Sequence, residues 1–173
     1  MIQIFKTEDG IVHQTDEIEL NSWIALTDPT AAEILEIADK FQVDPDHLRA
    51  PLDEEERSRI ESEDHYSLVL VDIPSIEERS GKDWYVTIPL GIIMMETNII
   101  TVCLEETPVL NAFMDGRVRD FHTYMKTRFI LQILYKNASM YLQYLRVIEK
   151  KSETIEKKLH KSQKNQELIE LLE

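Results

Sequence analysis

The sequence predicts an α/β (α+β) protein, in which a three-layer α/β/α sandwich with a mixed sheet precedes long stalk-like helices. In the first two thirds of the chain, short apolar runs of strand length stand before and after two helix-start signals, which favours a layered body. Residues 117–173 contain neither glycine nor proline, the residues that usually mark helix ends. We therefore expect two parts, a body over residues 1–116 and a long helical arm over residues 117–173.

The beginning of the chain is typical of three short strands followed by two helices. The expected strands are residues 2–5, 11–15 and 22–27. Each helix is expected to begin at an Asp-Pro pair, Asp28-Pro29 and Asp44-Pro45, because aspartate caps a helix and proline fits its first turn. Together the two helices are expected to cover one face of the sheet.

The middle of the chain supplies the centre of the predicted sheet. Residues 66–73 are apolar on both faces, as expected for a strand that is covered above and below. Residues 75–83 indicate an exposed turn. Residues 84–95 and 99–104 indicate two strands whose connection is so short that they must form an antiparallel hairpin. Pro89 cannot donate a hydrogen bond to a neighbouring strand, so an edge or a bulge is predicted there.

The arm carries a heptad repeat, the pattern of helices that pair with other helices. Thr127 and Ser152 fill two gaps in a seam that consists of Tyr124, Leu131, Leu134, Ala138, Tyr141, Leu145, Ile148, Ile155 and Leu159. A second apolar set widens this face in the first half, namely Phe129, Ile130, Ile133, Met140, Tyr144 and Val147. We therefore expect the first half to be buried on more than one side. Leu145→Ala is expected to cost about 2–5 kcal/mol, as for a buried leucine.

The end of the arm contains a predicted interruption. Residues 162–165 are polar, and Asn165 is able to cap a final helix. Leu168, Ile169 and Leu172 would give that helix an apolar face that needs a partner. The chain stops at Glu173 without a helix-ending signal, so the natural protein is expected to continue.

The charge of the chain is unevenly distributed. The formal net charge is −14, which argues against a nucleic-acid partner, because phosphate contacts need clustered lysine and arginine. Residues 1–117 hold 26 acidic and 8 basic residues, whereas residues 118–173 hold 7 acidic and 11 basic ones. Two interpretations remain open, a surface that only keeps the protein soluble and a body whose negative field concentrates cations.

Motifs of catalysis are missing from the sequence. The four glycines are isolated, so neither a phosphate loop nor a dinucleotide-binding turn can be formed, and the five histidines lack metal-ligand spacing. Cys103 lies in a strand-like apolar run and is predicted to be a buried, inert thiol. We predict that the chain is not an enzyme, that it has no catalytic, cofactor-binding or metal-ligating residues and that it requires no cofactor.

One acidic run, Asp53 to Glu56, deserves a separate interpretation. Four consecutive carboxylates between a helix and a strand can offer oxygen ligands to a hard cation such as Mg2+. The alternative is a solvated acidic turn whose charges partly pair with Arg57 and Arg59, because consecutive residues converge on one ion only in a tight loop. A divalent cation is thus expected at most as a weak regulatory ligand.

The sequence shows no signal peptide and no apolar run that approaches the ~18–20 residues of a membrane span. The supplied chain is therefore predicted to be soluble and cytoplasmic.

The order of these segments resembles the cytoplasmic domain of the CorA-type magnesium transporter family. The resemblance is carried by Trp23 to Leu26, by Leu52 to Glu61 with the strand that follows, by Asn98 to Val102, and by the heptad arm that ends in residues 167–173. It implies a funnel-shaped α/β/α domain with stalk helices, a homopentamer, and a stalk that leads into two membrane helices with a Gly-Met-Asn tripeptide at the pore. Neither the membrane helices nor the tripeptide is in this sequence.

Members of that family that sense magnesium bind it between subunits through adjacent acidic residues of the second helix. The matching positions here are Arg49 and Ala50, neither of which is a metal ligand, so magnesium sensing by that route is not expected.

Two functional hypotheses follow. The first is a regulatory domain at the cytoplasmic face of a divalent-cation transporter, which gates the ion path instead of forming it. The second is a soluble α/β coiled-coil interaction module without a transport role.

Overall fold

The computed structural model describes residues 1–170, and side chains for residues 1–160. The chain divides into two compact units, Met1–Asn137 and Ala138–Glu173. The sequence placed the division after Gly116, but the segment between these two positions packs with the first unit. The helix elements are α1 (Ala31–Phe41), α2 (Pro45–Arg49), the 3-10 helix η1 (Ala50–Leu52), α3 (Pro108–Met114) and α4 (Lys126–Glu170).

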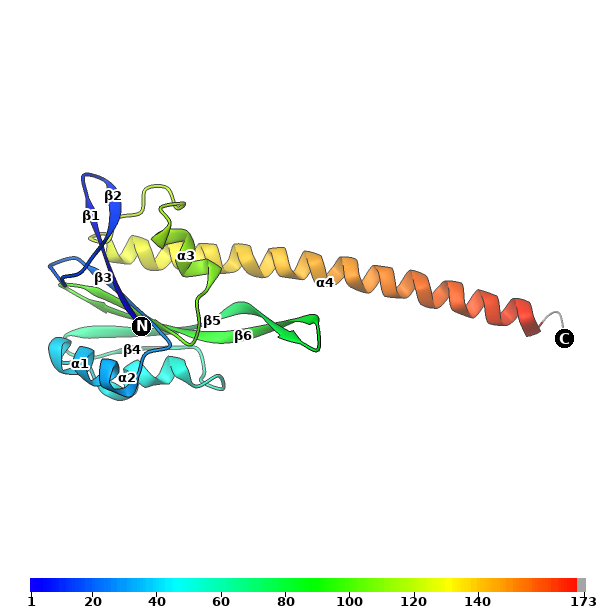
Figure 1. The fold of residues 1–173 in the computed structure, drawn as a ribbon, viewed down its shortest axis with the longest axis horizontal. Coiled ribbons are helices and arrows are strands. Elements are labelled where there is room, and N and C mark those ends of the chain that lie inside the picture. The colour runs from blue at the N-terminus through cyan, green and yellow to red at the C-terminus, as the bar shows by residue number, and fades with distance from the viewer. Residues whose placement is uncertain (171–173) are drawn as a thin grey trace. The chain divides into compact units, whose positions relative to one another are not determined.

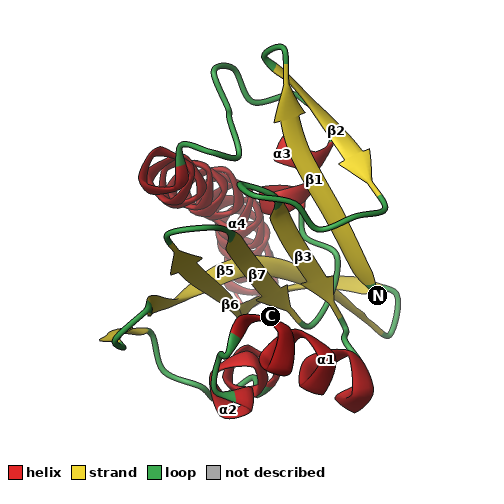
Figure 2. Ribbon diagram, turned by 90° about the vertical axis from the view of Figure 1, so that its left-hand side faces the viewer, coloured by secondary structure: helices red, strands yellow, loops and turns green. Residues whose placement is uncertain are grey.

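The first unit is built on one mixed sheet (Figures 1 and 2). Within residues 1–170 its seven strands are β1 (Ile2–Glu8), β2 (Ile11–Thr15), β3 (Trp23–Thr27), β4 (Arg59–Ser62), β5 (Tyr66–Arg79), β6 (Lys82–Met95) and β7 (Ile99–Cys103). Their order in space is β2-β1-β3-β7-β6-β5-β4, and the described pairs are antiparallel except for β3 with β7, which are parallel. The predicted mixed sheet is confirmed.

Helices cover both faces of this sheet, as Figure 2 shows. On one face α1 and α2 enclose a core in which Ile24, Leu26 and Leu68 are fully or almost fully buried. On the other face α3 and the start of α4 pack over an aromatic cluster that includes Trp23 and Phe129. Because successive strand residues point to opposite faces, neighbours such as Trp23 and Ile24 serve different cores. The three-layer α/β/α arrangement is therefore confirmed.

The two Asp-Pro signals behave differently. Asp44 is the N-cap of α2 and Pro45 its first residue, as predicted. The cap of α1 is instead Thr30, whose hydroxyl accepts the Glu33 N–H while the Glu33 carboxylate accepts the Thr30 N–H. This reciprocal capping box satisfies two free donors of the first turn. Asp28 lies outside the helix with a positive φ of 43°, so the predicted start at Asp28-Pro29 was two residues early.

Residues 75–83 are not an exposed turn. β5 and β6 continue through them as a hairpin that closes at Ser80 and Gly81, with φ of 53° and 72°. The neighbouring strands stop earlier, since β7 ends at Cys103 opposite Leu90 and β4 begins at Arg59 opposite Leu70. The outer part of the hairpin consequently has no third strand and keeps a polar, loop-like composition.

Pro89 lies inside β6 at the point where β6 becomes an edge on its β7 side, as predicted, and it interrupts no ladder. It is opposite Asp72, whose N–H points away from β6 and donates to Ser58 Oγ at 3.1 Å. The Pro89 nitrogen therefore faces the β7 side of the strand, where β7 has already ended at Cys103. The proline is placed where no partner needs its missing N–H.

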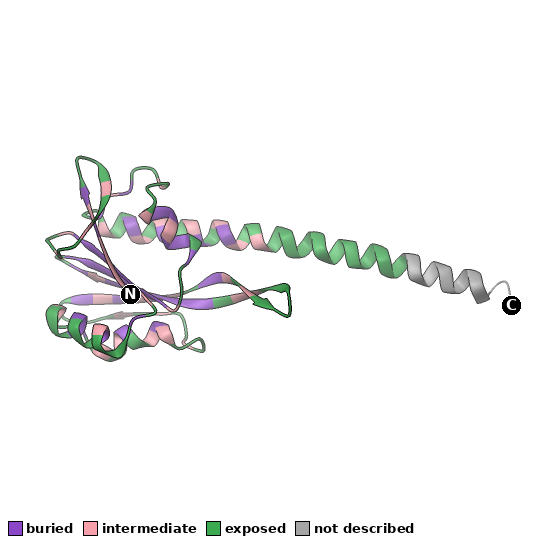
Figure 3. Cartoon of the chain, viewed as in Figure 1, coloured by how far each residue is buried: buried purple, intermediate pink, exposed green. Residues whose placement is uncertain are grey.

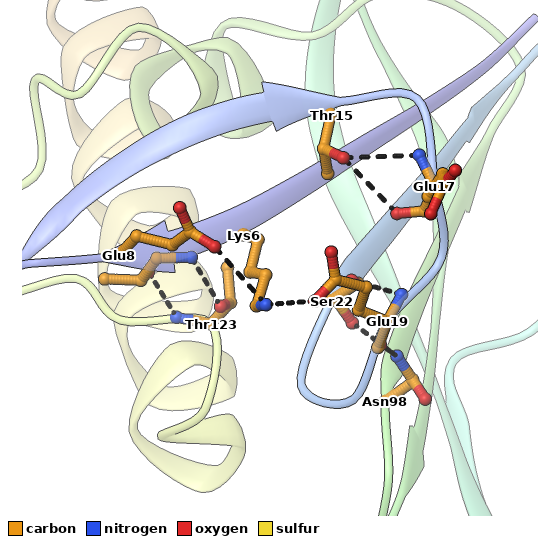
Figure 4. Close-up of polar contacts among 9 residues, drawn as sticks. Lys6, Glu8, Thr15, Glu17, Glu19, Ser22, Asn98 and Thr123 are labelled. Atoms are coloured by element: carbon orange, nitrogen blue, oxygen red, sulfur yellow. Dashed lines mark hydrogen bonds and ion pairs between the residues drawn. The ribbon is translucent and has the colours of Figure 1, made fainter.

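The helix of the arm begins later than predicted and has no interruption. Residues 117–125 are irregular, and Thr123 ties this segment to β1 by two reciprocal hydrogen bonds with Thr7, of 3.1 and 2.9 Å (Figure 4). α4 then runs from Lys126 to Glu170, so the predicted break at 162–165 was wrong. The side chains of Asn165, Leu168, Ile169 and Leu172 lie outside the described residues.

Candidate functional site

The acidic run Asp53 to Glu56 forms a turn in which carboxylates make hydrogen bonds and ion pairs with neighbouring residues. The Asp53 Oδ1 atom accepts the Glu55 N–H at 3.0 Å, and the Glu56 carboxylate is paired with Arg59. None of the four belongs to the group of described side chains whose ligand atoms come together. The turn thus has the features of the second interpretation, a solvated acidic turn that is partly neutralised by arginine.

Three other side chains do converge. One ligand atom each from His47, Glu61 and Glu63 lies within 4.8 Å of the other two, the one such group among the described side chains. His47 belongs to α2, Glu61 to β4, and Glu63 follows the end of β4. We call these three residues the His47 cluster.

The position of His47 is set by the start of β5. Tyr66, which is 5% exposed, directs its hydroxyl at α2. That oxygen accepts the Asp44 N–H at 3.2 Å and lies 2.7 Å from His47 Nδ1. Burial raises the pKa of Tyr66, so the phenol stays protonated at neutral pH. The opposite ring nitrogen, His47 Nε2, is thereby directed toward Glu61.

The two carboxylates are positioned by the edge of the sheet. Glu61 is directly opposite Leu68, a core residue beneath α1 and α2, so its side chain is on the α2 face. Its Oε2 atom lies 3.3 Å from His47 Nε2, and Arg59 holds Oε1. The Arg59 guanidinium lowers the pKa of Glu61, so this carboxylate is ionised at neutral pH. Glu63 is fixed by its N–H, which donates to the Tyr66 carbonyl at 2.9 Å.

Sequence reasoning missed the His47 cluster, because its members come from two segments that are distant in sequence, α2 and the end of β4. The five histidines lack metal-ligand spacing along the chain, and this spacing does not report on neighbours across a sheet edge. The alternation of Glu61 and Glu63 at the end of a strand was the one available signal, since alternate residues share a face.

Cys103 is fully buried at the end of β7. Burial raises the pKa of its thiol to about 11. The thiol is therefore protonated and shielded from reagents at neutral pH, as the prediction of an inert cysteine required.

A second candidate site is the apolar surface of α4. In the first unit α4 buries Phe129 and Ile133 completely, whereas the seam residues Leu131 and Leu134 are 62% and 36% exposed. In the second unit the exposed fractions of four seam residues are between 42% and 61%, at Leu145, Ile148, Ile155 and Leu159. The first half of α4 is therefore not buried on more than one side in the single chain, and Leu145 is not buried there either, because only the Phe129 side packs on the body. We call these six exposed seam residues the α4 stripe.

The burial pattern along α4 is visible in Figure 3, where purple segments near its start give way to exposed green ones. Among residues 1–170, no helix is both long and apolar enough to cross a membrane.

Comparison with known proteins places the chain in a family. A model of the CorA-like Mg2+ transporter protein family matches residues 20–173. The chain belongs to this family. The family consists of transporters, and the predicted resemblance to it is confirmed. No curated protein sequence matches the chain.

The CorA-like chain shares its fold with several solved structures, among them the following three. The soluble domain of CorA from Methanocaldococcus jannaschii has a TM-score of 0.75 at 23% identity, over 92% of this chain and 64% of that one. The complete CorA magnesium transporter of this organism has a TM-score of 0.73 at 19% identity, over 92% of this chain and 51% of that one. The ZntB cytoplasmic domain from Vibrio parahaemolyticus has a TM-score of 0.67 at 12% identity, over 86% of this chain and 62% of that one. The CorA-like chain thus spans 51–64% of these chains.

The two positions that the resemblance matches to the family's acidic pair lie at the end of α2. Arg49 is in the last turn of that helix and pairs with Asp46 at 2.9 Å, and Ala50 begins η1. Neither side chain offers an oxygen ligand, so this CorA-like chain has no acidic pair there.

Proposed function

We propose that this chain is the cytoplasmic regulatory domain of a CorA-like divalent-cation transporter, which gates the ion path instead of forming it. The observation that carries the proposal is the family match over most of the chain together with a 45-residue helix that follows the α/β/α body. In the intact protein α4 serves as the stalk that connects the body, on the cytoplasmic face, to membrane segments. Mg2+ or a related divalent ion is the transported substrate.

The α4 stripe supports an oligomeric stalk, a homopentamer in the intact transporter. Burying a leucine or isoleucine side chain contributes about 1.5–3 kcal/mol relative to leaving it in water. Six such side chains exposed at heptad spacing represent a large unfavourable free energy for a single chain. Packing against the same stripe of neighbouring copies removes this surface from water. Gating then consists of a change in how the bodies and stalks of neighbouring copies pack.

Association of the isolated 173-residue chain is expected to be weak. The acidic bodies repel one another at low salt, and the membrane segments that would tether them are not in this sequence. We expect monomers or dimers by sedimentation at micromolar concentration, with stronger association as salt screens the repulsion.

Leu145→Ala is expected to weaken this association, whereas Lys157→Ala, a change at an exposed lysine, leaves it nearly unchanged. Leu145 is 57% exposed in the single chain, so the cost of about 2–5 kcal/mol predicted for a buried leucine does not apply to dilute monomers. There both changes should cost under about 0.5 kcal/mol. A stable pentamer of the isolated chain would show that this domain drives assembly by itself.

The negative body attracts divalent cations only loosely. Magnesium needs near-octahedral oxygen ligands for tight binding, and the family's ligand positions are Arg49 and Ala50. At about 1 mM, Mg2+ near its Kd should stabilise the domain by only about 0.4 kcal/mol. Thermal melts with and without Mg2+ at matched ionic strength measure this shift. A stabilisation of several kcal/mol would contradict the weak-ligand proposal.

Ion uptake by the intact protein tests the proposed function. Reconstituted in liposomes that enclose a divalent-ion indicator, it should admit Mg2+ or a related ion, and Leu145→Lys should alter the rate because it places a charge in the stalk seam. The matched control Lys157→Ala should leave uptake unchanged. No divalent-ion uptake by the intact protein would contradict the proposal.

The alternative is a soluble coiled-coil interaction module, in which the α4 stripe binds a helix of another protein. The exposed stripe favours this candidate as well. It predicts that the intact protein is recovered without membranes and transports no ion, so the same uptake experiment separates the two functions.

A further inference from the structure

The contact between His47 and Glu61 needs a proton or a metal ion between its two atoms. His47 Nε2 and Glu61 Oε2 are 3.3 Å apart. A lone pair on the imidazole nitrogen repels a carboxylate oxygen at this distance, whereas a proton or a metal ion between the two atoms makes the contact attractive. Glu63 brings a second carboxylate within 4.8 Å of both ligand atoms. A proton on Nε2 can be donated to only one of the two carboxylates, whereas a metal ion bound to Nε2 can be coordinated by both.

We infer that His47, Glu61 and Glu63 bind one divalent transition-metal ion of the Zn2+ class, which replaces the proton on His47 Nε2. Two atoms that bind a tetrahedral zinc ion at about 2.0–2.2 Å lie about 3.4 Å apart. The distance between His47 Nε2 and Glu61 Oε2, 3.3 Å, matches this separation without movement of either residue. Glu63 is exposed and turns inward to become the third ligand.

The neighbours of the His47 cluster orient its ligands as the partners of metal ligands do. When Nε2 binds the ion, His47 Nδ1 carries the ring proton and donates it to the Tyr66 oxygen, 2.7 Å away. Arg59 bonds Oε1 of Glu61 and leaves Oε2 for the ion. Hydrogen bonds of this kind fix the ring and the carboxylate, and losing one typically lowers metal affinity 10- to 100-fold.

The ligand types select the class of ion. Imidazole suits zinc, nickel and copper, whereas magnesium prefers oxygen ligands and keeps several waters. One imidazole and two carboxylates also leave a fourth position open for water. A hollow of about 290 Å³ borders His47 and Glu63 and gives that water room. The site is independent of whether the intact protein transports ions, and it differs from the loose attraction of Mg2+ to the body.

Calorimetric titration of the 173-residue chain with ZnCl2, and in parallel with MgCl2, tests this site. We expect one Zn2+ per chain and no comparable heat from Mg2+. His47→Gln and Glu63→Gln should each weaken Zn2+ binding about tenfold or more, and Tyr66→Phe about 10- to 100-fold. Glu63→Gln changes an exposed side chain only, so it decides the outcome if His47→Gln fails to fold.

Two histidine variants serve as matched controls. His65 is packed against the same tyrosine ring as His47, but its Nε2 atom lies 2.6 Å from the Gln42 carbonyl oxygen. His160 pairs with Glu156 on α4 at 3.7 Å. His65→Ala and His160→Ala should keep the affinity for Zn2+. Undiminished binding by both His47→Gln and Glu63→Gln, loss of binding in a control, equal binding of Mg2+, or no Zn2+ binding at about 100 µM would overturn the inference.

Discussion

Phe129→Ala is expected to lower the free energy of unfolding of the body by about 3–5 kcal/mol, as for other buried phenylalanines. The Phe129 ring is fully buried, and its centroid lies 4.4 to 5.0 Å from those of Trp23, Phe113 and Phe121. Its removal leaves a cavity where the start of α4 packs on the sheet, so the effect combines lost burial with lost aromatic contacts. Urea unfolding, followed by tryptophan fluorescence, measures the change.

Leu131→Ala is the matched control, two residues further along the same helix. Leu131 is 62% exposed, so in a dilute monomer the change should cost under about 0.5 kcal/mol. Equal midpoints for the two variants would show that the Phe129 side of α4 does not anchor the helix.

Gly91→Ala is expected to destabilise the body by about 1–3 kcal/mol, because it overpacks a tight contact. A Cβ atom at Gly91 would lie 2.2 Å from Cγ of Pro51, in η1. A proline ring cannot rotate away as a flexible side chain would, so η1 has to move. The same segment follows α2, which carries His47, and the change should also weaken the proposed Zn2+ site.

The double variant Gly91→Ala with Pro51→Ala tests this cause. Removing the ring atoms of Pro51 should restore part of the lost stability, which a double-mutant cycle reports as a favourable coupling energy. Additive losses, or a Gly91→Ala protein as stable as the original, would mean that the close approach is not a constraint.

Local signals in the sequence predicted the elements that they determine. Asp44-Pro45 starts α2 as expected, because the cap and the proline act within one turn. The outer hairpin was missed for a tertiary reason. Residues 75–83 have no third strand beside them, so their composition is that of a loop although they form strands. Pro89 correctly indicated an edge, but which side of β6 is open depends on where β7 ends, which no local pattern reveals.

The two candidate functional surfaces, the α4 stripe and the His47 cluster, likewise depend on tertiary contacts that local sequence patterns do not reveal. The heptad repeat identified the seam of α4, but it did not reveal that Phe129 and Ile133 carry the contact with the body and leave the seam exposed. The His47 cluster depends on the register of β4 with β5, which places Glu61 on the α2 face, and on the Tyr66 hydroxyl. Neither the register nor this contact follows from residue spacing.

Disulfide cross-linking of the intact protein in its native membrane tests most directly whether the α4 stripe joins copies of a transporter domain. Cys103 is buried and its thiol pKa is raised to about 11, so within these 173 residues a cysteine introduced at Leu145 reacts without background from Cys103. Leu145→Cys should give disulfide-linked dimers under mild oxidation, because each copy carries one reactive thiol and each thiol forms one disulfide. Gln143→Cys, about 160° around the helix at 3.6 residues per turn, should give few or none. Equal cross-linking at both positions, or none at Leu145, would contradict the proposed stalk.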